Sequence, residues 1–393
     1  MPDPTPRPFP LRFGWVPFVA LVLLLQAAHV GVRAARSPRA DAFLIGDCPY
    51  YAAAARSLWE DGDFDLLDEL APGAPDPAAA LDRLRPHSSF FALGPDGRVV
   101  PKHSVLLPVL SCPMFALFGT AGLLAINVLQ LTLLTAGIAL LGGGGPGSRL
   151  LALAGLATTP LLAYSFNYSP DVLAAALLVW SAVLARRGRP GWGGLLAGLA
   201  VWAKVYLALL VLPVAAAVAA GGLRPLLRFG TAALAALLPM LLIHANLYGA
   251  PWASGYDREA HVAAGGFVLA EHYSRFNQPL GAGLANLLFD PSLGLAPTAP
   301  LWLLWPAGLA FLLARGGPAR RAERVWALAC AAVIAGNLLL FAPYDQWDAS
   351  VSGNRFLFPA LALGLAVQGP LWDALLARAR GGSGSAAGAS NGG

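Results

Sequence analysis

One aspartate stands where a catalytic carboxylate would be useful, just after the first apolar run of the chain. Asp47 is the second residue of the segment GDCPYYAAAARSLWEDGDFDL, in which the alanine-rich stretch from Pro49 to Trp59 predicts a short amphipathic helix. An aspartate in this position is a preferred helix N-cap. The same carboxylate can also point a lone pair into a cavity and take a proton from a reacting hydroxyl group. Capping and general-base catalysis are therefore both open for Asp47.

A second aspartate, Asp171, occurs in the segment NYSPDVL at the predicted outer start of a span. Ser169 as N-cap, Pro170 in the first helical position and the helix dipole explain this acid without any function. The acids from Glu60 to Glu69 are most simply a solvated loop face. The histidines of the second long loop, His261 and His272, lack a metal-ligand spacing such as HExxH.

The elements that must position these residues are membrane spans. The chain has 393 residues, of which 57% are hydrophobic and only 12% are charged, whereas soluble domains carry about 25% charge. The apolar residues are concentrated in runs of about 17 to 25, the length that crosses a bilayer. The composition argues against a soluble enzyme and predicts a single all-α polytopic membrane domain over residues 1–380.

The spans can be counted from the apolar runs and the arginines beside them. Because arginines flank the run 191–222 on both sides, it must cross an even number of times, as two short spans that meet outside near Lys204. The run 104–141 must cross once, so we expect residues 104–118 in the outer interface and 120–141 as the span. With the clear runs, about ten spans result and both termini are inside; those runs are near 13–34, 150–166, 171–185, 229–247, 298–314, 325–342 and 356–376.

Sorted by predicted side, the formal charge of +5 separates into +11 inside and −6 outside. The charge therefore indicates orientation in the membrane, and no nucleic-acid partner is expected. Two outer loops are long, residues 36–103 and 249–297, and function on a membrane scaffold is expected there. Residues 381–393, GGSGSAAGASNGG, predict a flexible cytoplasmic tail.

Several segments, in order, resemble a known family of membrane enzymes. They are an acidic first outer loop with an aromatic helix, PKHSVLLPVL followed by a glycine break, GLLAGLAVWAKVYLALLVLP, LFDPSLGLAPTAPL and QWDASVSGNRFLFPALAL. Together they resemble the GT-C-type glycosyltransferases, such as the protein mannosyltransferases (glycosyltransferase family 39-like) and the lipid A aminoarabinose transferases. The resemblance covers nearly the whole chain, and it rests on the order of the segments more than on any one of them.

The resemblance implies a fold of about ten spans and transfer of a sugar from a polyprenyl-phosphate donor to a lipid, glycan or protein acceptor. It implies Asp47 as the general base. Tyr50, Tyr51 and Asp171 would contact acceptor or sugar, although interfacial aromatic belts predict the same tyrosines. The anionic leaving group needs cations, although snorkelling to headgroups is the commoner reason for basic residues at span ends; the candidates are Lys102, His103, Lys204 and Arg355.

One departure from the family concerns the acidic pair of the first outer loop. Many relatives have Asp-Glu where this chain has Asp47 and Cys48. No metal ligand is therefore assigned, no cofactor is certain, and a divalent metal stays open. The three cysteines form no CxxC pattern, which leaves only a Cys48–Cys112 bridge to consider.

The expected location is the bacterial cytoplasmic membrane, with function at the cell envelope. Two other classes of protein remain open. A secondary transporter would show duplicated halves and charges near mid-membrane, and only Lys204 suits it. A non-catalytic component of a glycan assembly complex would suit Cys48 in place of the usual acid. An O-antigen ligase or polymerase would normally place its principal outer loop late in the chain.

Overall fold

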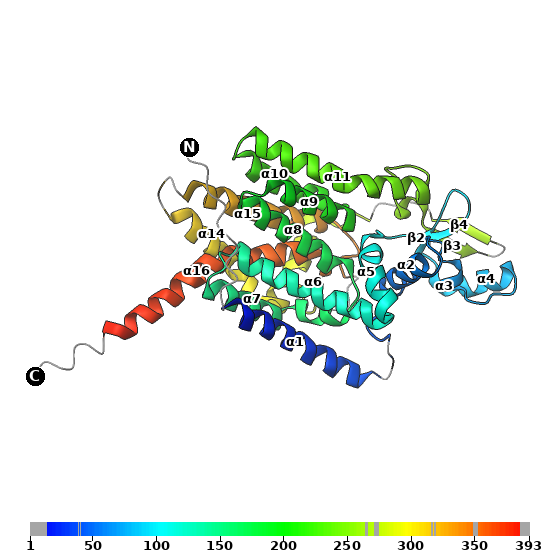
Figure 1. Ribbon diagram of the computed structural model, residues 1–393, viewed down its shortest axis with the longest axis horizontal. Coiled ribbons are helices and arrows are strands. Elements are labelled where there is room, and N and C mark those ends of the chain that lie inside the picture. Colours follow the sequence, from blue (N-terminus) through cyan, green and yellow to red (C-terminus); the bar gives the residue numbers. More distant parts are fainter. Residues whose placement is uncertain are drawn as a thin grey trace, which may run out of the picture.

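Long apolar helices form the body of the molecule, and short helices and hairpins gather at one end of it (Figure 1). The computed structural model describes residues 14–37, 39, 41–263, 266–270, 275–315, 317, 320–348 and 353–385. His272 and residues 386–393 of the expected tail lie outside these residues. The all-helical fold class predicted from composition is confirmed, because two small hairpins are the only sheets among the described residues.

Five helices among the described residues are long and apolar enough to cross a membrane. A bent pair, in which α7 and the 3₁₀ turn η2 meet at 67°, passes the same test when taken together. The five are α1 (Trp15–Arg36), α6 (Thr120–Leu141), α11 (Leu223–Tyr248), α15 (Arg321–Phe341) and the segment Arg355–Ala379, which comprises η6 (Arg355–Leu357) and most of α16 (Phe358–Ser385). The bent pair is α7 (Pro146–Thr158) and η2 (Pro160–Phe166).

The remaining predicted spans fall on helices shorter than a bilayer requires when straight. At about 1.5 Å per residue, helices of 13 to 17 residues reach only about 20 to 26 Å. They are α8 (Pro170–Arg186), α9 (Pro190–Ala203), α10 (Leu207–Ala219) and η4 (Pro300–Leu304) with α14 (Trp305–Ala314). The number of ten crossings therefore stays a prediction. Residues 104–118, predicted to lie in the outer interface, contain α5 (Leu106–Phe118), whose C-cap is Gly119.

Close backbone contact joins α9 to its neighbours, and glycines make this contact possible. A Cβ atom at Gly194 would lie 1.9 Å from the Phe229 carbonyl oxygen, and one at Gly198 would lie 2.3 Å from that of Ala233. Small residues are the usual means by which membrane helices approach closely. Because α8 packs on the other side of α9, helices α8, α9 and α11 form one layered unit.

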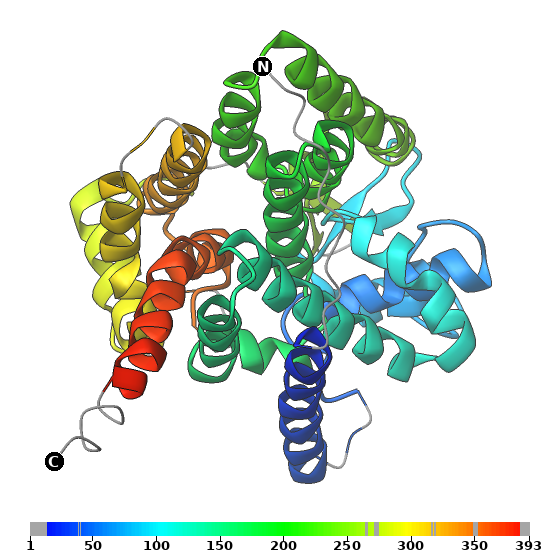
Figure 2. The same ribbon diagram turned by 60° about the vertical axis from the view of Figure 1, so that its left-hand side comes forward.

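Helix α16 lies along α7, α14 and α15 and ties the end of the chain to its middle. Asp373 accepts hydrogen bonds from the backbone N–H groups of Gly147 (2.7 Å) and Ser148 (3.1 Å) at the start of α7. α16 continues to Ser385, five residues into the predicted tail. Figure 2 shows α1 at the edge of the bundle, where Leu24 is 64% exposed, as expected of a lipid-facing helix.

The outer module combines the two long loops. The first loop contributes α2 (Cys48–Glu60), α3 (Leu67–Leu70), α4 (Pro77–Leu84), η1 (Arg85–His87) and the hairpin β1 (Phe91–Leu93) and β2 (Val99–Pro101). The second contributes η3 (Gly255–Arg258), β3 (Ala260–Ala263) and β4 (Gly266–Leu269), whereas its later helices α12 (Leu280–Phe289) and α13 (Leu295–Thr298) pack on α15 and η4 of the bundle. A β-bridge between Ala92 and Glu259 connects the two hairpins. The predicted helix from Pro49 to Trp59 is confirmed as α2.

Candidate active site

Asp47 takes the N-cap position of α2, but its side chain makes no capping hydrogen bond. Instead it points toward the bundle. Asp47 Oδ2 accepts a hydrogen bond from Arg355 Nη2 at 2.8 Å, and Asp47 Oδ1 lies 3.8 Å from His103 Nε2. The side chain is only 16% exposed. The cap explanation therefore accounts for the position of this residue and not for its carboxylate.

Arg355 lies between the two aspartates that the sequence singled out. Its Nε is 3.8 Å from Asp171 Oδ2, while its Nη2 contacts Asp47. The residue begins the turn η6, whose start is capped because the side chain of Asn354 accepts from the backbone N–H of Phe356 at 3.1 Å. This cap fixes the first turn of the last long helix, from which the Arg355 side chain reaches both aspartates.

Asp171 is 1% exposed and belongs to the same cluster. The expected cap is confirmed, since Ser169 Oγ accepts from the backbone N–H of Asp171 at 3.3 Å and donates to its Oδ2 at 2.7 Å. The other carboxylate oxygen, Oδ1, lies 3.2 Å from Lys204 Nζ. Lys204 has no acid near it in the sequence. The fold supplies one, because the break between α9 and α10 faces the start of α8.

Four charged side chains, largely shielded from solvent, thus form one continuous cluster: Asp47, Arg355, Asp171 and Lys204. Burial opposes ionisation of Asp47, but the positive charges of Arg355 and Lys204 outweigh it and lower the pKa of this carboxyl. Two carboxylates balance two cations. Both acids already pair with an arginine or a lysine. This set of side chains therefore does not fit a divalent cation, which would need carboxylate oxygens free to bind it.

His103 lies at the edge of this cluster. Its Nδ1 forms a hydrogen bond of 2.9 Å with the Tyr256 hydroxyl. Burial, together with the charges of Lys204, Lys102 and Arg355, lowers the pKa of His103 to about 3 in spite of Asp47. The imidazole is therefore neutral near pH 7, and it offers a hydrogen-bonding group rather than a charge.

Lys102 pairs with residues outside the four-residue cluster. Its Nζ lies 2.8 Å from Glu259 Oε2 and donates to the Ser89 carbonyl oxygen at 2.7 Å. Both side chains of the ion pair are 11% exposed. The ammonium also lies over the Tyr256 ring, 5.2 Å from its centre. Lys102 thus joins the two outer loops, and a phosphate would meet it only if this ion pair opened.

The two candidate tyrosines have different surroundings, because they lie on different faces of α2. Tyr51 is buried beside His103, with ring centres 5.4 Å apart. Tyr50 faces the core of the outer module, where it stacks on Phe90 and its hydroxyl is 3.0 Å from His87 Nδ1. The structure places Tyr51 next to the charged cluster and Tyr50 away from it.

Cys48 has a structural environment. Its thiol donates to Asn167 Oδ1 at 3.2 Å and is buried. Burial is the largest cause that raises the pKa of this thiol to about 12, so it stays neutral and is a poor metal ligand. Cys48, Cys112 and Cys330 are all free, and the bridge considered between Cys48 and Cys112 is absent from the described residues.

Sequence reasoning missed Tyr256 and Glu259, which approach the site from the second outer loop. The only signal was their place in a long outer loop, where His261 and His272 attracted attention instead. His261 pairs through Nδ1 with Ser89 Oγ at 2.9 Å, within the outer module. Tyr256 and Glu259 bind His103 and Lys102, which are consecutive residues of the first loop.

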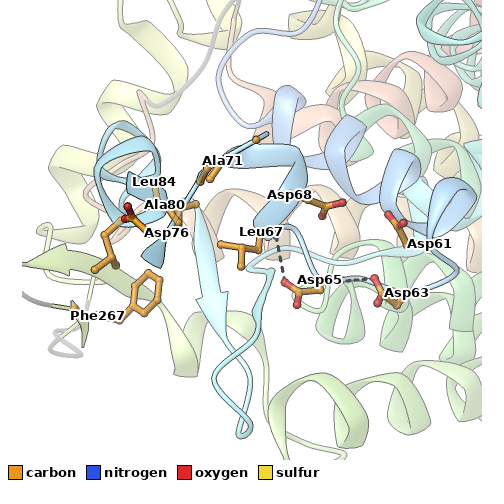
Figure 3. A pocket seen from close by; sticks show the side chains of 14 residues that line it. Asp61, Asp63, Asp65, Leu67, Asp68, Ala71, Asp76, Ala80, Leu84 and Phe267 are labelled. Carbon is orange, nitrogen blue, oxygen red and sulfur yellow. Dashed lines mark hydrogen bonds between the residues drawn. The ribbon is translucent and has the colours of Figure 1, made fainter. Parts of the chain in front are cut away.

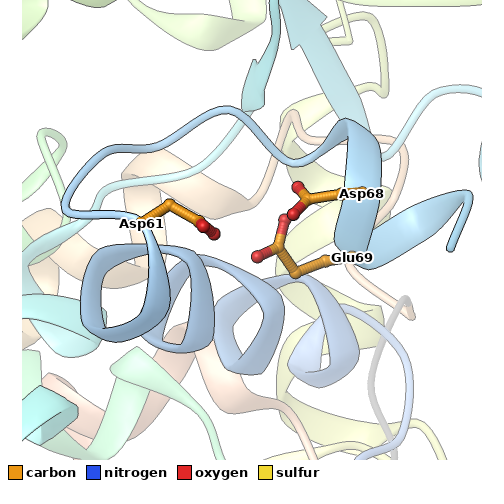
Figure 4. Close-up of side chains that lie close together, drawn as sticks. All are labelled: Asp61, Asp68 and Glu69. Atoms are coloured by element: carbon orange, nitrogen blue, oxygen red, sulfur yellow. The ribbon is translucent and has the colours of Figure 1, made fainter.

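A cavity of about 830 Å³ lies at the far end of α2, bordered by α3, α4 and β4 (Figure 3). Leu67, Leu84 and Phe267 give it an apolar wall, and aspartates line its rim. Asp61, Asp68 and Glu69 point toward one another beside it (Figure 4), and one carboxylate oxygen of each lies within 4.8 Å of the others. Because the 13 residues of α2 span about 20 Å, these acids are separate from the Asp47 cluster.

The arrangement can now be compared with known proteins. Neither a protein-family model nor a curated protein sequence matches the chain. Among solved structures, it is similar to ArnT from Cupriavidus metallidurans bound to undecaprenyl phosphate, with a TM-score of 0.57 and 14% identity over 91% of this chain and 60% of that one. It is also similar to the archaeal oligosaccharyltransferase AglB from Archaeoglobus fulgidus in complex with an inhibitory peptide and a dolichol-phosphate.

The match to AglB has a TM-score of 0.58 and 14% identity, over 94% of this chain and 52% of that one. This chain therefore spans about half to three fifths of the length of these two proteins. At identities this low, the two structural matches establish the fold alone. The chain is a multi-pass membrane protein with the GT-C fold, as the order of its sequence segments predicted.

Proposed function

We propose that this protein is an integral membrane glycosyltransferase that transfers a sugar from a polyprenyl-phosphate donor to a lipid, glycan or protein acceptor. The observation that carries the proposal is the ion pair of Asp47 with Arg355. It joins an acid on the first outer loop to a cation at the start of the last long helix, in a GT-C fold. The two similar structures hold undecaprenyl phosphate and dolichol-phosphate, which supports a lipid phosphate here too.

The residues of the cluster suit the two charge changes of such a transfer. Asp47 takes the proton of the acceptor hydroxyl while the hydroxyl oxygen attacks the anomeric carbon. The bond from this carbon to the phosphate oxygen breaks, with inversion, and its electron pair leaves on the polyprenyl phosphate. Arg355 and Lys204 stabilise the negative charge that develops there, Arg355 through a planar fork and Lys204 as a point charge.

Acceptor and sugar contacts belong to the side chains around Asp47. Tyr51 and His103 border it directly, and Asp171 keeps Arg355 and Lys204 on the opposite side. The proposal gives Tyr50 no contact, because its hydroxyl pairs with His87, and Lys102 contributes only after leaving Glu259. In the proposed setting the site faces outward from the bacterial cytoplasmic membrane, with both termini in the cytoplasm.

The test is sugar transfer by membranes that contain Asp47→Asn. The amide keeps the size of the side chain and removes the base, so we expect a loss of roughly 10² to 10⁴-fold in turnover. The measurement is transfer of radiolabel from a polyprenyl-phosphate sugar at equal protein levels.

The matched control is Asp96→Asn, the same change in the same loop on an exposed acid that pairs with Arg98. It should leave transfer unchanged. Equal transfer by wild type and Asp47→Asn would remove Asp47 from the mechanism. Absence of transfer by wild type from every polyprenyl donor would favour a transporter or a non-catalytic component.

A further inference from the structure

A second cavity, of about 480 Å³, lies between the turn that joins α8 to α9 and the flank of α11. It is at the opposite end of the bundle from the outer module (Figure 1). The 14 residues of α9 put about 20 Å between this cavity and the Lys204 end. Its walls are made chiefly by Arg189, Pro190, Trp192, Leu195, Arg228 and Ala232.

The shape of the cavity follows from the close contact of α9 with α11. At Gly194 the two backbones touch, because a Cβ atom there would lie 1.9 Å from the Phe229 carbonyl oxygen. Beside this contact the helices carry larger, exposed side chains, Trp192 on α9 and Arg228 on α11, and both line the cavity. We call this open cavity the wedge; it lies beside the contact at Gly194 and has Arg189 and Arg228 in its walls.

The chemistry of the wedge suits an anion. Arg189 and Arg228 supply two guanidinium groups. Arg189 is also the N-cap of α9 and makes no capping hydrogen bond, so the N–H groups of Gly191 and Trp192 in the first turn lack a side-chain cap. The described acids at this end bind elsewhere, Asp373 at the start of α7 and Glu323 with Arg320. Positive charge is therefore left in excess at the wedge.

An apolar track continues from the wedge along α11. Leu227, Leu234 and Leu238 are 56%, 69% and 55% exposed, and they follow one another at helical spacing on its outer side. Trp192, at the rim, is 62% exposed, and tryptophan favours the boundary between lipid and water. A phosphate group in the wedge with apolar chains along α11 matches both features. A soluble anion would use only the first.

We propose that this wedge binds the headgroup of an anionic phospholipid from the adjacent leaflet, with its acyl chains along α11. Arg189 and Arg228 bind the phosphate, and the bound lipid stabilises the contact between α9 and α11. The inference requires only that the chain spans a membrane. It holds whether or not the glycosyl transfer proposed above is correct.

The experiment uses the full-length protein purified in detergent, with phosphatidylglycerol as the probe and phosphatidylcholine as the neutral comparison. Native mass spectrometry measures how much of each lipid stays bound. We expect clear preference for phosphatidylglycerol in the wild type and a loss of roughly tenfold or more in Arg189→Gln/Arg228→Gln, because basic groups at the membrane surface each favour anionic lipid.

The matched control is Arg321→Gln/Arg378→Gln, which removes two exposed arginines from the same end but outside the wedge. It should retain phosphatidylglycerol like the wild type. If the first double variant fails to fold, Arg189→Lys/Arg228→Lys keeps the charge and should lose part of the preference. Unchanged phosphatidylglycerol binding in the variants with altered wedge arginines would overturn the proposal. Displacement of the lipid by an equal concentration of inorganic phosphate would do so too, because it would show a soluble-anion site.

Discussion

At the scale of residues, the site is a chain of opposite charges in which each member has a neighbour of the other sign. Lys204 and Asp171 are 3.2 Å apart, and Arg355 links Asp171 to Asp47. Buried ions of this kind add little net stability, but removing one partner leaves an expensive unpaired charge. Structure and function therefore overlap at Lys204, and a single substitution there would not separate them.

A pair of substitutions does separate them. Lys204→Met leaves Asp171 with only the more distant Arg355, so we expect a loss of roughly 3 kcal/mol in the free energy of unfolding. Adding Asp171→Asn removes the unpaired charge and should restore most of that stability. Thermal unfolding in detergent measures both.

Activity should not follow stability in this pair. If Lys204 stabilises the leaving phosphate, the double variant stays at least about tenfold slower in sugar transfer although it is folded. Full activity in the stable double variant would show that Lys204 serves only to neutralise Asp171. Ser165→Ala, a change of a buried side chain that bonds the Leu162 carbonyl, tests whether any disturbance nearby has the same effect.

At the scale of elements, local features were predictable and the contacts between distant elements were not. The helix after Asp47 follows from its alanine-rich pattern, and the break at Lys204 follows from the arginines on both sides of it. Both signals lie within about 20 residues. The meeting of Asp47 with Arg355 depends on how a whole bundle packs, and no sequence pattern encodes which of several outer cations an acid will reach.

The same limit applies to the outer module. The two long loops were expected to carry function, but their joining through Lys102 and Glu259 was not foreseen. Each residue looks like an ordinary loop charge in the sequence. Only the pairing of the hairpins, with the bridge between Ala92 and Glu259, brings them together. The acids from Glu60 to Glu69, expected to form a solvated face, include Glu69 with a perturbed carboxyl.

The corner formed by α2 and α3 should make the outer module sensitive to pH. Burial and the nearby negative charges of Asp68 and Asp61 raise the pKa of Glu69 to about 8. In the unfolded chain a glutamate ionises near pH 4.3. Between these values the folded state holds a proton that the unfolded state has lost, so stability falls as the pH rises from about 5 to 8.

Glu69→Gln should remove this slope and stabilise the module at pH 8.5, by roughly 1 kcal/mol because solvent screens a partly exposed group. The fluorescence of Trp59, at the end of α2, offers a probe of thermal unfolding. Glu60→Gln, on an exposed carboxylate that pairs with Arg56, is the control and should keep the slope. A wild-type protein equally stable at pH 5 and pH 8.5 would contradict this origin of the perturbed pKa.

At the scale of the whole molecule, basic residues outnumber acids at one end, and acids outnumber basic residues at the other. Arg186 Nη1 donates to the Leu141 carbonyl oxygen at 2.6 Å, so the ends of α8 and α6 meet where the basic residues gather. Helix α2, whose N-cap is Asp47, lies with the rest of the outer module at the far end of the same helices (Figure 1). This separation agrees with the charge asymmetry of the sequence. The side of the membrane on which each end lies then depends on whether the shorter helices cross it.

The pair α9 and α10 decides the topology, because each helix is too short to cross a bilayer core of about 30 Å when straight. If both cross, residues on either side of the pair face the same compartment; if the pair crosses once, they face opposite ones. Cysteines can report this after Cys112→Ser removes the partly exposed native thiol. We expect Asp96→Cys to react with an impermeant maleimide in intact cells.

Gly191→Cys and Arg224→Cys should both react only after the membrane is opened. Gly191 has open space where the new side chain would go, and Arg224 is exposed, so neither change should disturb the fold. Labelling of Arg224→Cys in intact cells, with Gly191→Cys protected, would mean that α9 and α10 form one bent crossing. In that case the positions that follow would reverse sides. Because Glu259 and Arg355 come after this pair and contact the first outer loop in the fold, we expect the even count.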